Sequence, residues 1–114
     1  MRTRWPRRIL GVVLAVLTAT VLLVAAALPA TAMTVTFVRH AESQANFDGV
    51  IDTSVPGPGI TPAGKAQALA VADKLAATGI DYDAIYTSTM QRTSETAEPF
   101  AKKTGLEPTP LAGV

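Results

Sequence analysis

Hydrophobic residues occupy a few short, separated stretches of this chain, and the first stretch is the longest. Ile9–Leu28 is almost wholly apolar over about 20 residues, a length that can cross the hydrocarbon core of a bilayer. The small residues Ala30-Thr31-Ala32 follow it, and it is preceded by Arg2, Arg4, Arg7 and Arg8. This order of basic, apolar and small-residue regions is typical of a secretory leader.

We therefore expect residues 1–32 to be a signal peptide or an N-terminal membrane anchor. The small residues before Met33 favour cleavage, whereas the length of the apolar run keeps an anchor open, with membrane contact through residues 9–28. In both cases the positive-inside rule leaves the arginines in the cytoplasm. The remainder is then exported, either secreted or anchored on the outer face of the cytoplasmic membrane.

Beyond the leader, a strand and a loop are expected. Thr34–Val38 is β-branched and aromatic with no breaker, which predicts a short buried strand that ends at Arg39 and His40. From Phe47 to Gly59 the sequence is dense in glycine, proline and aspartate, which predicts a loop.

A first helix is predicted to begin with Thr61 as its cap and Pro62 in its first position. Gly79 is placed to end it in a left-handed conformation. Its narrow apolar face, with helical spacing, consists of Ala68, Val71, Ala72 and Leu75.

A second strand and helix follow. Ala84–Tyr86 predicts the strand, and Ser88 or Thr89 can cap a helix that runs towards Lys103 and closes at Gly105. Pro99 removes one backbone hydrogen bond inside that helix, so we expect a kink or an early break there. Glu107–Pro110 is expected to be a linker or the approach to a third strand.

Alternation of strand and helix predicts an α/β fold, a three-layer α/β/α arrangement with a mainly parallel sheet, preceded by an apolar leader helix. Two strands cannot bury both faces of such a sheet. We therefore expect residues 33–114 to be an incomplete, N-terminal half of a domain rather than a small complete protein.

Charge and cysteine content exclude several classes of function. The chain has ten Lys and Arg against nine Asp and Glu, but four of the ten precede residue 9, so the part after the leader is net acidic. Such a surface has no diffuse attraction for a nucleic acid, and no nucleic-acid partner is expected. Because cysteine is absent, disulfides and thiolate metal sites are excluded.

Candidate chemistry is concentrated after the two predicted strands. Arg39 and His40 end the first strand, and Arg92 follows the second one. Because ligands of open α/β sheets bind beyond the carboxyl ends of the strands, we expect two arginines and a histidine to converge on one crevice.

Three motifs occur in order over residues 34 to about 97. They are Arg39-His40-Ala41-Glu42-Ser43 with Asn46, then Ile60-Thr61-Pro62-Ala63-Gly64-Lys65-Ala66-Gln67-Ala68, then Ser88 with Arg92 and Thr96-Ala97. This arrangement resembles the N-terminal portion of the histidine phosphatase superfamily, whose members are phosphoglycerate-mutase-like. Ala41 stands where that family usually has glycine, and a positive φ there would crowd its methyl group.

The resemblance implies a phosphoryl-transfer site that needs neither a metal nor another cofactor. His40 is then the nucleophile and becomes a phosphohistidine, which requires an unprotonated ring nitrogen. Arg39 and Arg92 clamp the phosphoryl oxygens with forked donors, and Asn46 donates a neutral N–H to them. The expected partner is a small phosphorylated substrate.

The predicted function is a phosphomonoester hydrolase that is truncated and impaired in this chain. The family's second histidine is missing, since the sequence has a single histidine, and no proton donor is recognised among Glu95, Glu98 and Glu107. Loss of a general acid costs about 10²- to 10⁴-fold in rate. A catalytically inert phosphate-binding or membrane-anchored stub is the alternative.

A phosphoglycerate-type mutase is disfavoured. The loop between Asn46 and Thr61 lacks the tryptophan-bearing pattern of the glycolytic enzymes, and their substrate is cytoplasmic. Among the remaining polar residues, Glu42 is expected to hold the loop rather than to act directly. Asp48 and Asp52 are expected to be turn residues, and lining of the substrate entrance is the alternative role for both.

Overall fold

The computed structural model describes residues 31–114. The predicted leader and its membrane contact through residues 9–28 therefore lie outside the described residues, apart from positions 31 and 32. The described residues fall into two units that divide after Thr36, and every element below lies in the second, Phe37–Val114. Within residues 31–114, no helix combines the length and the apolar character needed to cross a membrane.

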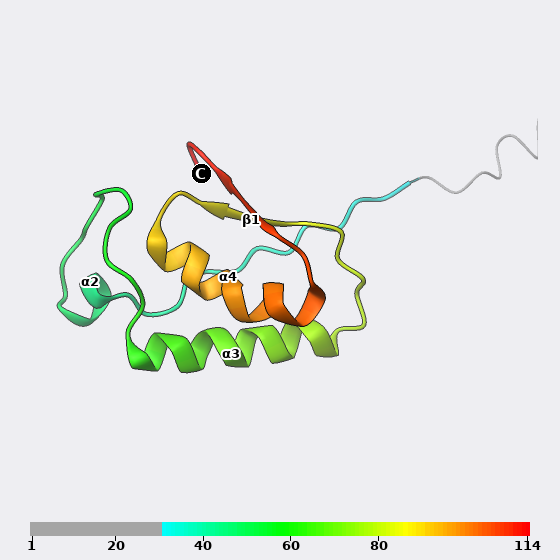
Figure 1. The fold of residues 1–114 in the computed structure, drawn as a ribbon, viewed down its shortest axis with the longest axis horizontal. Coiled ribbons are helices and arrows are strands. Elements are labelled where there is room, and N and C mark those ends of the chain that lie inside the picture. Colours follow the sequence, from blue (N-terminus) through cyan, green and yellow to red (C-terminus); the bar gives the residue numbers. More distant parts are fainter. Residues whose placement is uncertain (1–30) are drawn as a thin grey trace, which may run out of the picture. The chain divides into compact units, whose positions relative to one another are not determined.

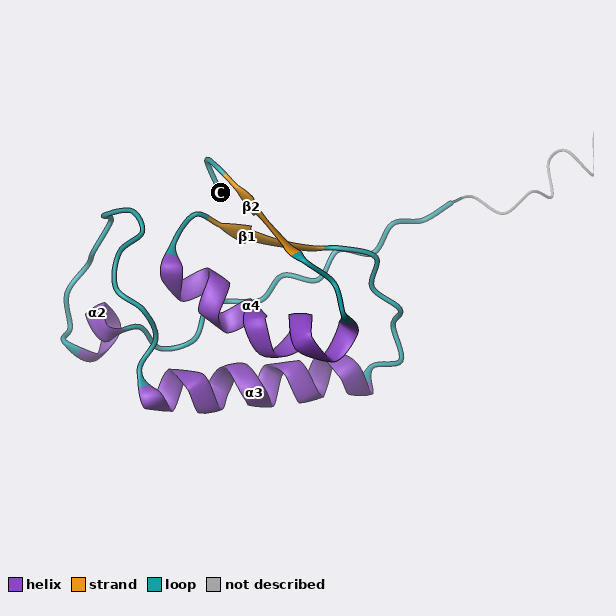
Figure 2. Cartoon of the chain, viewed as in Figure 1, coloured by secondary structure: helices purple, strands orange, loops and turns teal. Residues whose placement is uncertain are grey.

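The second unit combines helices with a small parallel sheet (Figures 1 and 2). Its elements in chain order are α2 (Gln44–Phe47), α3 (Pro62–Ala77), β1 (Ile85–Ser88), α4 (Gln91–Thr104) and β2 (Pro108–Leu111). The strands β1 and β2 pair in parallel from Ile85↔Pro108 to Ser88↔Leu111, and α4 is the crossover between them. The α/β class and the parallel sheet are therefore confirmed, and Glu107–Pro110 does lead into a strand.

Helix α3 forms as its sequence predicts. The hydroxyl of Thr61 accepts a hydrogen bond from the N–H of Gly64 at 3.0 Å, and Pro62 occupies the first turn, where its missing donor costs nothing. Ala68 and Ala72 are buried on the apolar face. Two residues past the last helical one, Gly79 has φ 73°, the left-handed conformation that glycine favours.

Helix α4 departs from its prediction at two points. The cap is Met90 and not Ser88 or Thr89, because the Ser88 hydroxyl is used by the N–H of Met90 and by the hydroxyl of Thr93. Of the kink or early break predicted at Pro99, the early break is wrong, since α4 continues to Thr104, and the kink stays a prediction. The bond that Pro99 removes is offset by packing of the next residue, Phe100, which is buried.

The core lies between the two long helices and under the sheet. Helix α4 packs against both strands, and α3 packs against α4 rather than against the sheet. Phe100 meets the ring of Tyr82 edge-on at 5.5 Å between centroids, and Lys103 pairs with Asp73 of α3 at 2.8 Å. The small side chains of Ala68 and Ala72 allow this close packing of α3 on α4.

The first predicted strand, Thr34–Val38, is not a strand in the structure. Residues 31–42 contain no regular element, and the Phe37 side chain is 92% exposed. A strand needs backbone partners on a neighbour, and within the described residues β1 and β2 pair only with each other. Thr34–Val38 is apolar and β-branched as the sequence shows, but a local pattern does not specify which strand such a segment would pair with.

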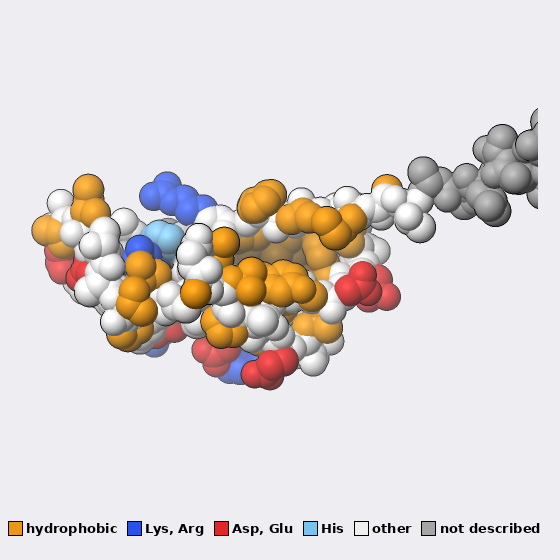
Figure 3. Space-filling view, turned by 90° about the horizontal axis from the view of Figure 1, so that it is seen from above, with side chains coloured by type: hydrophobic (Ala, Val, Ile, Leu, Met, Phe, Trp, Pro, Cys, Tyr) orange, Lys and Arg blue, Asp and Glu red, His pale blue; other side chains and the backbone are white. Residues whose placement is uncertain are grey.

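One face of the sheet stays open in the described part of the chain. Along β1, Thr87 is buried, whereas Tyr86 is 64% exposed, and Leu111 at the end of β2 is 39% exposed. Figure 3 shows apolar side chains gathered and hollowed on this upper face. The second helical layer of a three-layer fold therefore stays a prediction.

Replacing Phe100 by alanine should destabilise the fold by about 3 kcal/mol or more, because it empties the junction between α4 and Tyr82. Replacing Tyr86 by alanine removes a comparable ring that is 64% exposed, so it should change stability by about 0.5 kcal/mol at most. Urea denaturation of both variants checks this. Equal losses would contradict the position assigned to the core.

Candidate active site

The segment Arg39–Ser43, here the His40 loop, has no regular structure, yet Ala41 and Ser43 are buried within it. Buried backbone groups need partners, and other parts of the chain supply them. The N–H of Ala41 donates to the Thr96 hydroxyl at 3.0 Å, and the N–H of Glu42 donates to the Gln67 side-chain oxygen at 2.9 Å. Two other motifs of the sequence therefore hold the loop that carries His40.

Thr61 and Gly64 attach the start of α3 to Glu42. The N–H of Thr61 donates to the Glu42 carbonyl at 3.0 Å, and its hydroxyl donates to the Glu42 carboxylate at 2.6 Å while accepting from Gly64. A Cβ at position 64 would overlap the Glu42 carbonyl oxygen, so the approach requires glycine. Glu42 is thus a loop-holding residue, as the sequence indicated.

The end of the His40 loop forms a capping box for the one-turn helix α2. The Ser43 hydroxyl accepts from the N–H of Asn46 at 3.2 Å, and the Asn46 side-chain oxygen accepts from the N–H of Ser43 at 3.1 Å. Ser43 also forms an antiparallel bridge with Ile60. Asn46 is exposed, and its amide nitrogen donates no hydrogen bond within the described residues, so it is available to an anion.

The imidazole of His40 is half-buried and is oriented by the backbone of the next residue, Ala41. Nδ1 lies 2.7 Å from the carbonyl oxygen of Ala41. A carbonyl can only accept, so Nδ1 carries the proton, and in the neutral ring Nε2 keeps its lone pair. Ala41 fits without strain, because no residue other than glycine has a positive φ in the described chain. The alanine that replaces the usual glycine is thus accommodated.

Thr96 links this loop to Arg92 in the first turns of α4. Its hydroxyl accepts from Ala41 and donates to the carbonyl of Arg92 at 2.6 Å. Because one hydroxyl oxygen makes both bonds, the backbone N–H of Ala41, the residue after His40, lies close to the backbone carbonyl of Arg92. The two motifs therefore meet through backbone groups, and convergence of the His40 and Arg92 side chains on one crevice stays a prediction.

The loop before α3 closes over the start of α4. Arg92 Nη1 donates to the backbone carbonyl of Asp52 at 3.3 Å, and the N–H of Gln91 donates to Pro56 at 2.9 Å. Glu95 accepts from the N–H of Ile60 at 2.7 Å through one carboxylate oxygen and from Gln91 at 2.8 Å through the other. Both oxygens of Glu95 are therefore engaged in structure.

Asp52 is a turn residue, as its sequence context indicated. Hydrogen bonds from the Ser54 hydroxyl and then the Ser54 backbone N–H hold the pKa of Asp52 below its usual 3.8, and the Arg92 guanidinium lowers it further. Asp48 similarly accepts from the Gln44 side chain at 3.0 Å. These contacts do not direct either carboxylate towards His40.

The four predicted site residues are placed unequally. His40 and Arg92 are half-buried, whereas Arg39 and Asn46 are exposed. Arg39 makes no hydrogen bond or ion pair within residues 31–114, so its convergence with the others stays a prediction. His40 does not follow a strand here, whereas Arg92 does follow β1.

The supporting roles of Thr61, Gly64, Gln67 and Thr96 were not predicted, although all four stand in the motifs. Their positions within the three motifs were the available signal. Those positions do not show which backbone group each side chain contacts. The described residues contain no cluster of three His, Cys, Asp or Glu side chains that could hold a metal ion.

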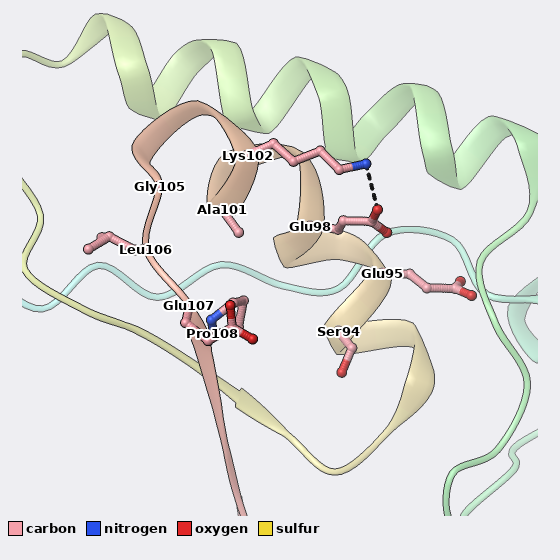
Figure 4. A pocket seen from close by; sticks show the side chains of 9 residues that line it. All are labelled: Ser94, Glu95, Glu98, Ala101, Lys102, Gly105, Leu106, Glu107 and Pro108. Atoms are coloured by element: carbon pink, nitrogen blue, oxygen red, sulfur yellow. Dashed lines mark ion pairs between the residues drawn. The ribbon is translucent and has the colours of Figure 1, made fainter.

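A separate hollow of about 530 Å³ lies between α4 and the start of β2 (Figure 4). Glu98, Lys102 and Glu107 line it, and His40 and Arg92 do not. Glu98 and Lys102 form an ion pair at 2.7 Å, which lowers the pKa of Glu98, and both side chains are largely exposed. Such a pair contributes little to stability.

Replacing Gly64 by alanine should destabilise the chain by about 1–3 kcal/mol, since the new methyl group displaces the Glu42 carbonyl. Helix propensity alone predicts the opposite sign, a gain of about 1 kcal/mol. The control Ala66→Gly, exposed in the same helix, isolates that propensity term. Stabilisation by G64A in chemical denaturation would contradict the close approach.

Replacing Ser54 by alanine should raise the pKa of Asp52 towards 3.8, as followed by carboxyl NMR titration. Thr53→Ala removes a neighbouring hydroxyl that does not contact Asp52, so it should leave the titration unchanged. Because the folded pKa is depressed, the turn's contribution to stability is present above about pH 4 and is lost as the pH falls through the folded value. An equal pKa of Asp52 in S54A and in the parent chain would contradict the hydrogen bond from the Ser54 hydroxyl to Asp52.

Comparison with known proteins identifies the relatives of this site. PE-PGRS family protein PE_PGRS11 of Mycobacterium tuberculosis (strain ATCC 25618 / H37Rv) is 46% identical over 78 residues, covering 68% of this chain and 13% of that protein. The 2,3-bisphosphoglycerate-dependent phosphoglycerate mutase of Bartonella quintana (strain Toulouse) is 33% identical over 78 residues, covering 68% of this chain and 37% of the mutase. The mutase of Bartonella henselae (strain ATCC 49882 / DSM 28221 / CCUG 30454 / Houston 1) is 37% identical over 65 residues, covering 57% and 31%.

The chain thus spans 37% or less of the length of each of these relatives. The family model of the histidine phosphatase superfamily (branch 1) matches residues 35–114, which include all three motifs. On this evidence the chain belongs to the histidine phosphatase superfamily.

Proposed function

We propose that residues 33–114 carry the nucleophilic part of a phosphomonoester hydrolase that acts through a phosphohistidine at His40. The observation that carries this proposal is the contact of His40 Nδ1 with the Ala41 carbonyl, because in the neutral imidazole it selects the tautomer whose lone pair is on Nε2. The link through Thr96 brings Arg92 into the same region. Family membership supports the same chemistry.

The reaction has two displacements. The Nε2 lone pair of His40 attacks phosphorus, the bond from phosphorus to the ester oxygen breaks, and that oxygen leaves as an alcohol once it gains a proton. Water then attacks the phosphohistidine, the N–P bond breaks, and inorganic phosphate leaves. The Nδ1 proton stays on the ring throughout and holds it in orientation against Ala41.

Charge neutralisation is assigned to arginine. One N–H of Arg92 is used by the Asp52 carbonyl, and a guanidinium has five, so the remaining donors can bind phosphoryl oxygens. Arg39 is exposed and uncommitted within the described chain, and the Asn46 amide nitrogen is likewise available to the same oxygens. These three residues form the proposed phosphate clamp.

Turnover is proposed to be impaired because two carboxylates of the motifs, Glu42 and Glu95, are already engaged in hydrogen bonds. Glu42 is bound to Thr61, and Glu95 is bound to Ile60 and Gln91. The 114 residues contain a single histidine, so they themselves offer no second imidazole to the phosphate. Phosphoryl transfer to His40 should therefore be better preserved than release of a poor leaving group.

A mutase is the second candidate, since two relatives bear that name. Both activities begin with phosphohistidine formation and differ in whether water or a second substrate accepts the phosphoryl group. An inert phosphate-binding stub is the remaining alternative and would stop before that step. Export through residues 1–32, with secretion or anchoring outside the cytoplasmic membrane, stays a proposal that rests on the leader pattern.

The test supplies the full chain with an aryl phosphate and an alkyl phosphate and measures acid-labile phosphate on His40. We expect phosphohistidine from the aryl ester, and a rate about 10²- to 10⁴-fold lower from the alkyl ester, whose leaving oxygen needs a proton. His40→Ala and Arg92→Ala should abolish or strongly reduce labelling. Lys74→Ala removes an equal charge on the exposed side of α3 and should not.

Each outcome separates the candidates. Efficient hydrolysis of the alkyl ester that is abolished by H40A would falsify the claim that the chain lacks a proton donor. Transfer of the label to a phosphoglycerate rather than to water would favour the mutase. A folded chain that binds phosphate but never forms phosphohistidine would favour the stub.

A further inference from the structure

The hydroxyl of Thr96 joins α4 to the His40 loop, a contact that helix formation alone does not require. Threonine in a helix commonly donates back to the carbonyl four residues earlier, as Thr104 does to Phe100 at 3.0 Å. Thr96 makes the same bond to Arg92 at 2.6 Å but also accepts the N–H of Ala41, 55 residues away, at 3.0 Å. The side chain is buried, at 8% exposure, so water does not readily replace these bonds.

We propose that Thr96 is a positioning residue for the nucleophile, which sets the tautomer of His40 and couples it to Arg92. Ala41 is the connecting residue, because its N–H is held by Thr96 and its carbonyl accepts Nδ1–H of His40. Fixing Ala41 in place fixes the acceptor that keeps the proton on Nδ1. The catalytic meaning of this role rests on the proposed function.

The hydroxyl can serve both neighbours only because it donates once and accepts at its lone pairs. Valine has nearly the same shape but can do neither. A valine at position 96 would leave the Ala41 N–H buried without a partner, which favours movement of the His40 loop away from α4. That movement would release the Ala41 carbonyl from Nδ1 and let the proton distribute between the two ring nitrogens.

Coupling to Arg92 follows from the other half of the bridge. The same hydroxyl donates to the Arg92 backbone carbonyl, so one oxygen atom sets the spacing between the backbone of Ala41 and the backbone from which the Arg92 side chain extends. A displacement of about 1 Å at a reacting group can cost about 10²-fold in rate. Loss of the hydroxyl should therefore slow phosphorylation of His40 more than it weakens binding of inorganic phosphate.

The experiment uses the single histidine of the chain, which gives one imidazole in a ¹⁵N-histidine-labelled sample. The nitrogen spectrum of the neutral ring reports directly whether Nδ1 or Nε2 carries the proton, and it needs no enzymatic activity. The variants are Thr96→Val, Thr96→Ser, which keeps the hydroxyl, and Thr104→Val, which removes a back-bonded hydroxyl from the same helix without touching the His40 loop.

We expect the Nδ1-protonated form to dominate in the parent chain, in T96S and in T104V, and to give way to a mixture in T96V. Phosphorylation by an aryl phosphate should fall by about 10- to 100-fold in T96V and recover in T96S. A folded T96V with the parent's tautomer would overturn the proposal. So would a folded T96S that loses it, which decides the matter even where T96V does not fold.

Failure of the proposed function is distinguishable from failure of this inference. If no variant forms phosphohistidine but the tautomer still changes only in T96V, the hydrolase assignment is wrong and the positioning role stands. If phosphohistidine forms equally in the parent chain and in T96V with unchanged tautomers, the positioning role is wrong and the phosphotransfer assignment stands.

Discussion

The His40 loop has to satisfy buried backbone groups without a helix or strand of its own, and the rest of the site follows from where it finds partners. Glu42 is the central residue, since its N–H, carbonyl and carboxylate all bind to the first two turns of α3. This contact is close enough to require glycine at position 64. Because an unsatisfied buried group costs about 1–3 kcal/mol, the loop is held by hydrogen bonds rather than by a large apolar core.

The same constraint explains why three motifs accompany one histidine. Thr61 and Gln67 stand six residues apart, so both lie near the start of α3, where they meet successive groups of Glu42. Thr96 follows Arg92 by one helical turn and binds the residue after His40. The motif residues outside the proposed phosphate clamp thus help to hold the backbone segments that carry His40 and Arg92.

Local patterns in the sequence predicted the elements that depend on local physics. The cap at Thr61, the apolar face through Ala68 and the left-handed Gly79 were all correct, because each follows from helix geometry alone. The strand expected at Thr34–Val38 was wrong, since pairing needs a neighbour that no local pattern identifies. For the site, the motifs indicated candidate residues, which stay a prediction, whereas the partners of Thr61 and Thr96 are set by tertiary contacts that no local pattern specifies.

Hydrogen exchange of individual backbone amides tests most directly whether these motifs form one structure around His40. The amides of Ala41 and Glu42 lie in irregular backbone but donate to Thr96 and Gln67, whereas those of Ile51 and Thr53 have no hydrogen-bond acceptor within the described chain. The hydrogen-bonded loop predicts slow exchange at Ala41 and Glu42 and fast exchange at Ile51 and Thr53. Exchange at Ala41 and Glu42 as fast as at Ile51 and Thr53 would contradict it.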